Sequence, residues 1–263
     1  MLDRPDGDHY ALHSLLRAFA RQKLRESGEF EATQADHFAY FSRFVESRLP
    51  ELRGMDQLLA LRELAAEFGN IYAAWWYGTD KAPVSQLLSM MDGIYELCVA
   101  RSWYAVGIEV ATTSKEALTR RGMTGLMGRL LLHEGLIHHH LGNYHQATLC
   151  ADEGRVLCER EADPKGVAQA LFLSSTIHYD SNQYEEAERL ITESLNLNRS
   201  INNWEGVGDW YLFMGHITDL RTIFSPQGKQ PYKPPHPFMY EHYWPTIEQR
   251  KGAEEAIVLF KEA

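Results

Sequence analysis

Apolar side chains recur along the chain at intervals of three and four residues, the spacing that places them on one face of an α-helix. The clearest stretch runs from Leu58 to Trp76, and Gly78-Thr79-Asp80 predicts the end of that helix. Further helices are predicted over 31–49, 82–100, 103–120, 123–141, 144–161, 166–180, 184–200 and 204–223. No apolar run alternates in the way that predicts a strand. The fold class that follows is all-α.

The predicted helices form pairs that repeat along the sequence. Aligning 131–167 with 171–207, an offset of 40, puts identical or small residues opposite one another. The positions that define the repeat are Gly135, Ser175 and Gly215, then Ala147 and Ala187, then Tyr144 and Tyr184. Small side chains let antiparallel helices approach closely, and a fixed period of this size is typical of stacked helical arrays.

The second helix of each pair resembles that of the tetratricopeptide repeat (TPR), which carries the pattern Ala-x₃-Phe-x₂-Ala. Ala256, Phe260 and Ala263 keep this pattern at the end of the sequence. The resemblance implies a right-handed α-α superhelix, a TPR-like solenoid. Two features depart from the family. The period is 40 rather than about 34, which implies longer helices or a longer loop between repeats. Prolines between 226 and 237 also interrupt the third copy.

The N-terminus carries a second resemblance. Residues 10–24 read Tyr-Ala-Leu-His-Ser-Leu-Leu-Arg-Ala-Phe-Ala-Arg-Gln-Lys-Leu. They resemble the tail of the winged-helix domain in STAND-class signalling ATPases, which include AfsR-like and MalT-like bacterial regulators and NB-ARC proteins. Glu67 and Asn70 keep the Glu-x-x-Asn spacing of the linker that opens the repeat array in those proteins. The resemblance implies that His13 senses nucleotide in a parent protein. The alternative is that His13 packs between helix and wing.

These features predict four segments. Residues 1–50 are the C-terminal part of a winged-helix domain, a short helical remnant, with its linker helix. Residues 51–223 are TPR-like repeats, 224–238 a proline-rich loop, and 239–263 the truncated start of a further repeat. We therefore expect a fragment of a larger regulator, with a nucleotide-binding domain upstream in the full-length protein.

Composition and charge narrow the function classes. The chain of 263 residues has 36 acidic and 26 basic residues, a net charge of −10, which argues against direct nucleic-acid binding. Its apolar runs are too short to span a membrane, its N-terminus lacks the apolar core of a signal peptide, and its three cysteines fit a reducing compartment. We expect a cytoplasmic protein without a cofactor. No Gly-x₄-Gly-Lys-Ser/Thr motif occurs, so the chain has no phosphate-binding loop for ATP hydrolysis.

Repeat proteins bind partners mainly through the continuous inner wall formed by their first helices. In this register the first helices are 123–141, 166–180 and 204–223. Their non-packing positions supply His133, His139, His140, Gln169, Asp180, Asp209 and His216 as candidates for a concave groove. Such a groove would take a protein or peptide partner, or a small inducer. Adjacent residues on a helix point about 100° apart, so the run His138-His139-His140 predicts no metal site.

Three functions remain. The first is the protein-interaction or ligand-sensing repeat region of a STAND-type signalling or transcriptional regulator, with no catalytic residue of its own. The second is a free-standing TPR adaptor or peptide-binding protein. The third, which ranks last, is a metal-dependent enzyme that uses the histidine cluster. Residues 1–50 favour the first, because a winged-helix remnant has no purpose in a free adaptor.

Overall fold

The computed structural model describes residues 2–3, 11–12, 14–52, 56–204, 206–208 and 213. The chain divides into two compact units, Met1–Val207 and Gly208–Ala263, and the description below concerns the first. Several expectations lie outside the described residues: His13, Asp209, Gly215, His216, Ala256 and Phe260, with the segments 224–238 and 239–263.

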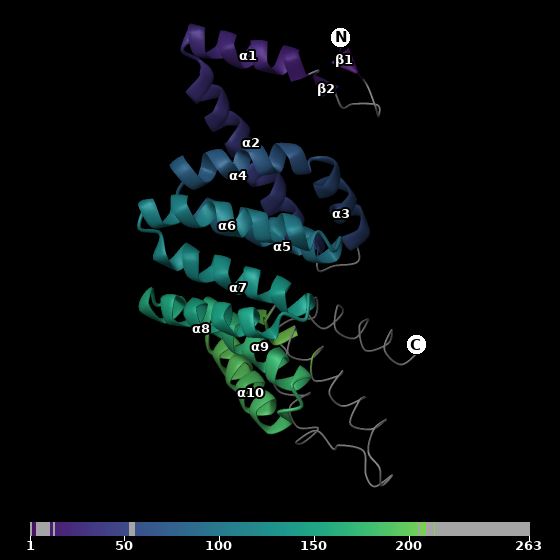
Figure 1. The fold of residues 1–263 in the computed structure, drawn as a ribbon, viewed down its shortest axis with the longest axis vertical. Coiled ribbons are helices and arrows are strands. Elements are labelled where there is room, and N and C mark those ends of the chain that lie inside the picture. The colour runs from purple at the N-terminus through teal and green to yellow at the C-terminus, as the bar shows by residue number, and fades with distance from the viewer. Residues whose placement is uncertain are drawn as a thin grey trace. The chain divides into compact units, whose positions relative to one another are not determined.

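The described part of the first unit is all-α apart from one pair of two-residue strands (Figure 1). The strands β1 (Leu2–Asp3) and β2 (Ala11–Leu12) are antiparallel, with Leu2 opposite Leu12. The expectation of no strand missed this pair, because two residues are too short to show an alternation. The helices are α1 (Ser14–Ser27), α2 (Phe30–Leu52), α3 (Gln57–Ala66), α4 (Phe68–Lys81), α5 (Val84–Ala100), α6 (Tyr104–Arg120), α7 (Thr124–His140), α8 (Tyr144–Arg160), α9 (Pro164–Asp180) and α10 (Tyr184–Ser200).

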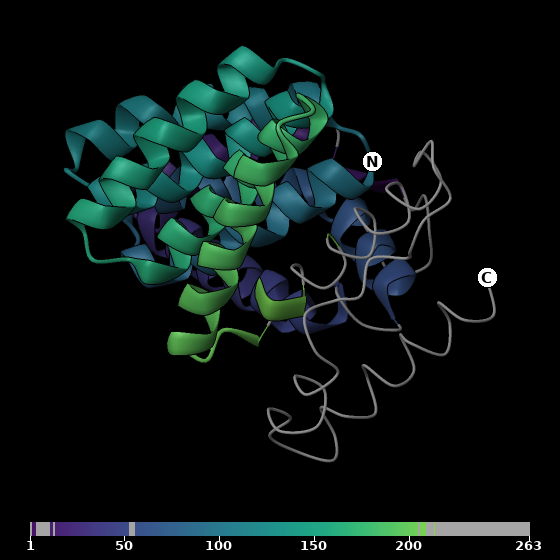
Figure 2. The ribbon, with the colours of Figure 1, turned by 90° about the horizontal axis from the view of Figure 1, so that it is seen from below.

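Helices α5 to α10 repeat with a regularity finer than the pairs seen in the sequence. Each has 17 residues, and their first residues are evenly spaced along the chain, from Val84 and Tyr104 to Pro164 and Tyr184. Consecutive helices pack against one another throughout this stretch (Figure 1, Figure 2). Every turn between them has the same short length, so the long period of the sequence arises from long helices and not from a long loop between repeats.

One turn geometry closes each of these helices. The residue after the C-cap has a positive φ between 52° and 73° at Ser102, Gly122, Gly142, Ala162, Asn182 and Asn202. In the third of these turns, Gly142 N–H donates to the carbonyl of His139, and Asn143 N–H donates to the carbonyl of His138. This pair of hydrogen bonds is typical of the Schellman motif, which satisfies the last carbonyls of a helix and reverses the chain. The structure is therefore a helical repeat-like array built from one turn used again and again.

The predicted helix 58–76 is divided and extended. Glu67 separates α3 from α4, and α4 continues through Gly78-Thr79-Asp80 to Lys81, where the sequence predicted an end. Gly78 serves packing instead: a Cβ at this position would lie 2.4 Å from the ring of Phe38 on α2. That distance is far below van der Waals contact, so only glycine allows α2 and α4 to lie so close.

The linker helix expected over 31–49 corresponds to α2, whose last residue lies two residues beyond the predicted boundary at 50. Helix α2 runs from Phe30 to Leu52 and packs against α4 and α5. Val45 of α2 is fully buried, and a Cβ at Gly93 of α5 would lie 2.3 Å from it. The linker helix is thus part of the array's core.

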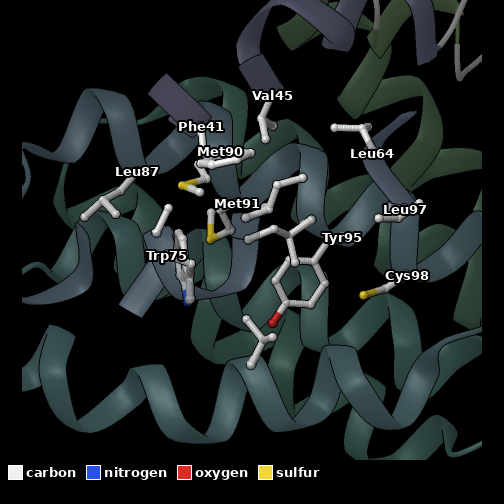
Figure 3. Close-up of a cluster of buried hydrophobic side chains, with 14 of the residues drawn as sticks. Phe41, Val45, Leu64, Trp75, Leu87, Met90, Met91, Tyr95, Leu97 and Cys98 are labelled. Atoms are coloured by element: carbon white, nitrogen blue, oxygen red, sulfur yellow. The ribbon is translucent and has the colours of Figure 1, made fainter. Parts of the chain in front are cut away.

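Large apolar side chains fill the N-terminal part of the array. One continuous cluster runs from α2 to α7, and Figure 3 shows Trp75, Met90, Met91 and Tyr95 at its centre. The indole of Trp75, which is fully buried, donates a hydrogen bond of 2.9 Å to Ser114 Oγ of α6. Trp75 is therefore a core residue and not an exposed binding anchor.

In the C-terminal part of the array, the helices cross closely at positions with small side chains. A Cβ at Gly135 would lie 2.8 Å from Leu173 and 3.0 Å from Cys150, and Ala147 is fully buried beside them. The crossing of α7 and α8 brings Gly128 and Gly154 together. The equivalent crossing of α9 and α10 brings together Ala168 and Ser194, and Ser194 Oγ donates a 2.8 Å hydrogen bond to the carbonyl of Ala168. These contacts recur at equivalent positions of the two repeats, as the sequence register predicts.

Candidate functional site

The predicted groove residues that the structure describes lie on α7 and α9, but α7 does not present an open surface. This helix packs against α5, α6, α8 and α9, and most of its residues between Leu126 and Ile137 are buried. His133 is only 7% exposed. Its ring stacks on Tyr95 at 4.8 Å, and its Nε2 lies 2.9 Å from Asp92 Oδ1. The expectation that His133 stands at a non-packing position is wrong, because a first helix in the middle of the array has neighbours on both sides.

The link between His133 and Asp92 ties α7 to α5. An ionised carboxylate only accepts hydrogen bonds, so Nε2 of His133 is the donor. Burial acts to raise the pKa of Asp92, but the hydrogen bond from His133 and the charges of His133, Arg129 and Lys165 outweigh it, and the pKa is lowered. Asp92 therefore stays ionised at neutral pH and maintains the link between α5 and α7.

Gln169, a second predicted groove residue, belongs to a matching link between α7 and α9. Its side-chain oxygen accepts a 2.9 Å hydrogen bond from Arg129, which is 6% exposed. The Nε of Arg129 also lies 3.3 Å from Asp163, an ion pair without hydrogen-bond geometry. A second buried charge on α7, Glu134, pairs with Lys115 of α6 at 2.7 Å. Sequence reasoning missed Arg129 and Glu134, because charged residues on a helix are normally assigned to solvent.

The remaining described candidates meet at one edge of the array, where first helices end and second helices begin. His140, the last residue of α7, stacks on Tyr104, the first of α6, with ring centroids 5.8 Å apart and planes at 12°. Asp180, the last residue of α9, receives hydrogen bonds from His139 Nε2 at 2.9 Å and from the hydroxyl of Tyr144, the first residue of α8, at 3.4 Å. We call these two contacts the Tyr104–His140 joint and the Tyr144–Asp180 joint.

The two joints differ in charge and exposure. Partial burial lowers the pKa of His140, and the charge of His139 adds to this effect, so the Tyr104–His140 joint is neutral at pH 7. The Tyr144–Asp180 joint contains a carboxylate instead of an imidazole, and this carboxylate also contacts His139. Tyr144 is 39% exposed, and the charge of Asp180 raises the pKa of its hydroxyl. The two joints therefore offer the rings of Tyr104 and Tyr144 and the carboxylate of Asp180.

Other candidate chemistry finds less support in the described residues. They contain no group of three or more His, Cys, Asp or Glu side chains placed to hold a metal ion. All three cysteines are buried, and burial raises the pKa of Cys98 to about 12 and those of Cys150 and Cys158 to about 11. Such thiols remain protonated at neutral pH and are poor nucleophiles. No described helix is long and apolar enough to cross a bilayer.

Comparison with known proteins finds no family model that matches the chain, and no curated protein or solved structure that matches it.

Proposed function

We propose that this chain is the protein-interaction or ligand-sensing repeat region of a STAND-type signalling or transcriptional regulator, and that it catalyses no reaction itself. Its partner would be a protein or peptide, or a small inducer, and a nucleotide-binding domain would precede it in the full-length protein. A TPR-like superhelix would supply the long surface that such recognition needs.

The observation that carries this proposal is the apolar face of α1. Leu15 is 73% exposed and Phe19 58%, while Leu16 beside them is 38% exposed. Soluble helices seldom leave several large apolar side chains together in water, and such a patch marks a surface that another domain covers. The tail of a winged helix would be covered in this way by the body of its own domain.

Two further observations support the same placement. The strands β1 and β2 pair immediately before α1, as the two strands of a wing would before the tail helix. The C-terminal end of α1 leads into α2 through a short turn: Glu29 N–H donates to the carbonyl of Leu24, and the Arg25 guanidinium lies 4.9 Å from the ring centroid of Phe30, the first residue of α2. The turn joins α1 to α2, and the exposed apolar side chains lie in the N-terminal half of α1.

Reading the gene upstream of Met1 and expressing the longer protein tests the proposal. We expect a phosphate-binding loop in the same reading frame, and amides of α1 that exchange hydrogen more slowly in the longer protein than in residues 1–263. Helix α10 serves as the control, because its exchange should not change. A gene that starts at Met1 and encodes no such domain would exclude the STAND assignment and favour a free-standing adaptor.

The absence of a phosphate-binding loop gives a second test. Residues 1–263 alone should neither hydrolyse ATP nor bind it tightly. Low-micromolar affinity for ATP or ADP, measured by calorimetry, would contradict the proposal as stated.

A further inference from the structure

The two joints at the edge of the array are the same position of the repeat filled in two ways. In the register of the repeat, Tyr144 is equivalent to Tyr104, and Asp180 is equivalent to His140. In each joint the first residue of a second helix contacts the last residue of the following first helix. The first joint pairs a tyrosine with an imidazole, and the second pairs a tyrosine with a carboxylate. Because their backbones are equivalent, the difference lies in the side chains alone.

The carboxylate of Asp180 is held in one orientation and remains open on one side. Both of its side-chain hydrogen bonds among the described residues, from His139 and Tyr144, end on Oδ2. No described residue donates to Oδ1, and the side chain of Asp180 is 37% exposed. Two donors on one oxygen fix the carboxylate plane, and a neutral His139 ring leaves the carboxylate charge in place. A second oxygen is then left for a donor from outside.

Partly exposed tyrosine rings lie along the same edge as this carboxylate. Tyr144 is 39% exposed, and Tyr184, which begins the next second helix, is 37% exposed and contacts Tyr179 at 5.4 Å between ring centroids. A cation over the face of a tyrosine is attracted by the ring's quadrupole, and a nearby carboxylate adds a charge-assisted hydrogen bond. An oriented carboxylate beside an exposed tyrosine is thus complementary to a guanidinium or ammonium group.

We propose that the Tyr144–Asp180 joint binds an arginine or lysine side chain of a partner polypeptide. Asp180 Oδ1 accepts a hydrogen bond from the cation, the ring of Tyr144 covers one face of it, and His139 positions the carboxylate through Oδ2. The proposal rests on the proposed function only in taking the partner to be a polypeptide. The Tyr104–His140 joint does not bind the same group, because it lacks the negative charge.

The test titrates the whole chain with a capped Gly-Gly-Arg-Gly-Gly peptide and records the chemical shifts of the chain by NMR. We expect shifts at Tyr144 and Asp180, and a weaker response to the lysine peptide, because a compact, strongly hydrated ammonium group stacks less well on a tyrosine ring than a planar guanidinium. A glutamine peptide should give no response. Asp180→Asn should lower the affinity about tenfold, the factor that corresponds to about 1.4 kcal/mol. Tyr144→Phe keeps the ring and should lower it less.

Two variants separate this site from general attraction by an acidic protein. Asp152→Asn removes the same charge from an exposed position of α8 and should leave the affinity unchanged. His140→Asp combined with Val99→His rebuilds the second joint beside Tyr104, because Val99 stands where His139 does in the register. This double variant should raise the number of peptides bound from one to two. Equal losses for Asp180→Asn and Asp152→Asn would overturn the proposal, as would a peptide that shifts neither Tyr144 nor Asp180. These outcomes are independent of the gene sequence upstream of Met1, so this proposal and the proposed function can fail separately.

Discussion

The array packs differently on the two sides of α7. Between α2 and α7, one continuous cluster of large side chains fills the space between helices, and Trp75, Tyr95 and Leu87 are almost wholly buried in it. Between α7 and α10, the helices cross at glycine, alanine and serine, and the apolar clusters are small. Large side chains can fill helix junctions of varied geometry, whereas close crossings require the same small residue at the same place.

This difference explains why the repeat is visible in only part of the sequence. Close crossings restrict residue type, so the positions of Gly135 and Ala147 recur in the next repeat as Ser175 and Ala187. The N-terminal cluster is filled mainly by large side chains, so α5 and α6 keep the 17-residue length with few identities to α7 and α8, such as Tyr104 with Tyr144 and Ala111 with Ala151. Removing volume should therefore be most costly in the N-terminal cluster, and adding volume should be costly at the close crossings, which in the C-terminal region include Gly135 and Ala147.

The largest effect is expected from removing volume in the N-terminal cluster. Trp75→Ala should lower the free energy of unfolding by about 3–5 kcal/mol, because it leaves a cavity and removes the hydrogen bond to Ser114. Trp75→Phe keeps most of the volume and should cost less than half as much. Denaturant titration measures both. A loss below about 1 kcal/mol for Trp75→Ala would show that the cluster is not the stabilising core.

Larger side chains should lower stability at the close helix crossings of the C-terminal region. Gly135→Leu and Ala147→Leu should each cost on the order of 1–3 kcal/mol, since neither crossing has room for a larger side chain. Gly69→Ala is the matched control: a Cβ there meets nothing within 4 Å, so this substitution should be neutral or slightly stabilising. Unchanged melting temperatures for both leucine variants would mean that the repeat register is wrong.

Alkaline pH should destabilise both regions, through Cys98 in the N-terminal cluster and through Cys150 and Cys158 in the C-terminal region. Folding raises the thiol pKa values, to about 11 for Cys150 and Cys158 and about 12 for Cys98. A group with a raised pKa contributes its full stability below the unfolded value, about 8.5, and loses it as pH rises toward the folded value. The free energy of unfolding should therefore fall above about pH 9. Cys98→Ala and Cys158→Ala should each reduce the slope, and slopes parallel to that of the parent chain would contradict this assignment.

The smallest effect concerns the repeated turn. Ala162 occupies, at a φ of 52°, the position that Gly142 fills one turn earlier at 73°. A left-handed conformation costs an alanine about 1 kcal/mol that glycine does not lose. Ala162→Gly should therefore raise the free energy of unfolding by up to about 1 kcal/mol, and Gly142→Ala should lower it by a similar amount. Thermal unfolding of the two variants checks the pair, and shifts of the same sign would contradict the turn assignment.

Much of the helical layout could be predicted from the sequence, because apolar periodicity and turn residues act locally. The predicted bounds of α5, α6, α8 and α10 lie within two residues of the observed ones. Gly78 misled the prediction, since a glycine that allows close packing looks like one that ends a helix. His133 misled it too, because periodicity does not reveal that α7 is covered from both sides.

The candidate edge could be predicted only in pieces. The sequence singled out Asp180 and His139 as binding residues, and Tyr144 as a structural marker of the repeat. Their meeting at one joint depends on the packing of α9 against α7 and α8, which places side chains far apart in the sequence within hydrogen-bond distance. The sequence shows that His140 and Asp180 differ in type, but it does not show which tyrosine each of them contacts.

Hydrogen exchange in Gly135→Leu tests most directly whether two modes of packing hold the array together. Read by mass spectrometry under native conditions, amides of α7 to α10 should lose protection together, because each of these helices buries its face against the next. Amides of α2 to α5 should keep their protection, since the large cluster does not depend on that crossing. Equal loss of protection from α2 to α10 would contradict the account.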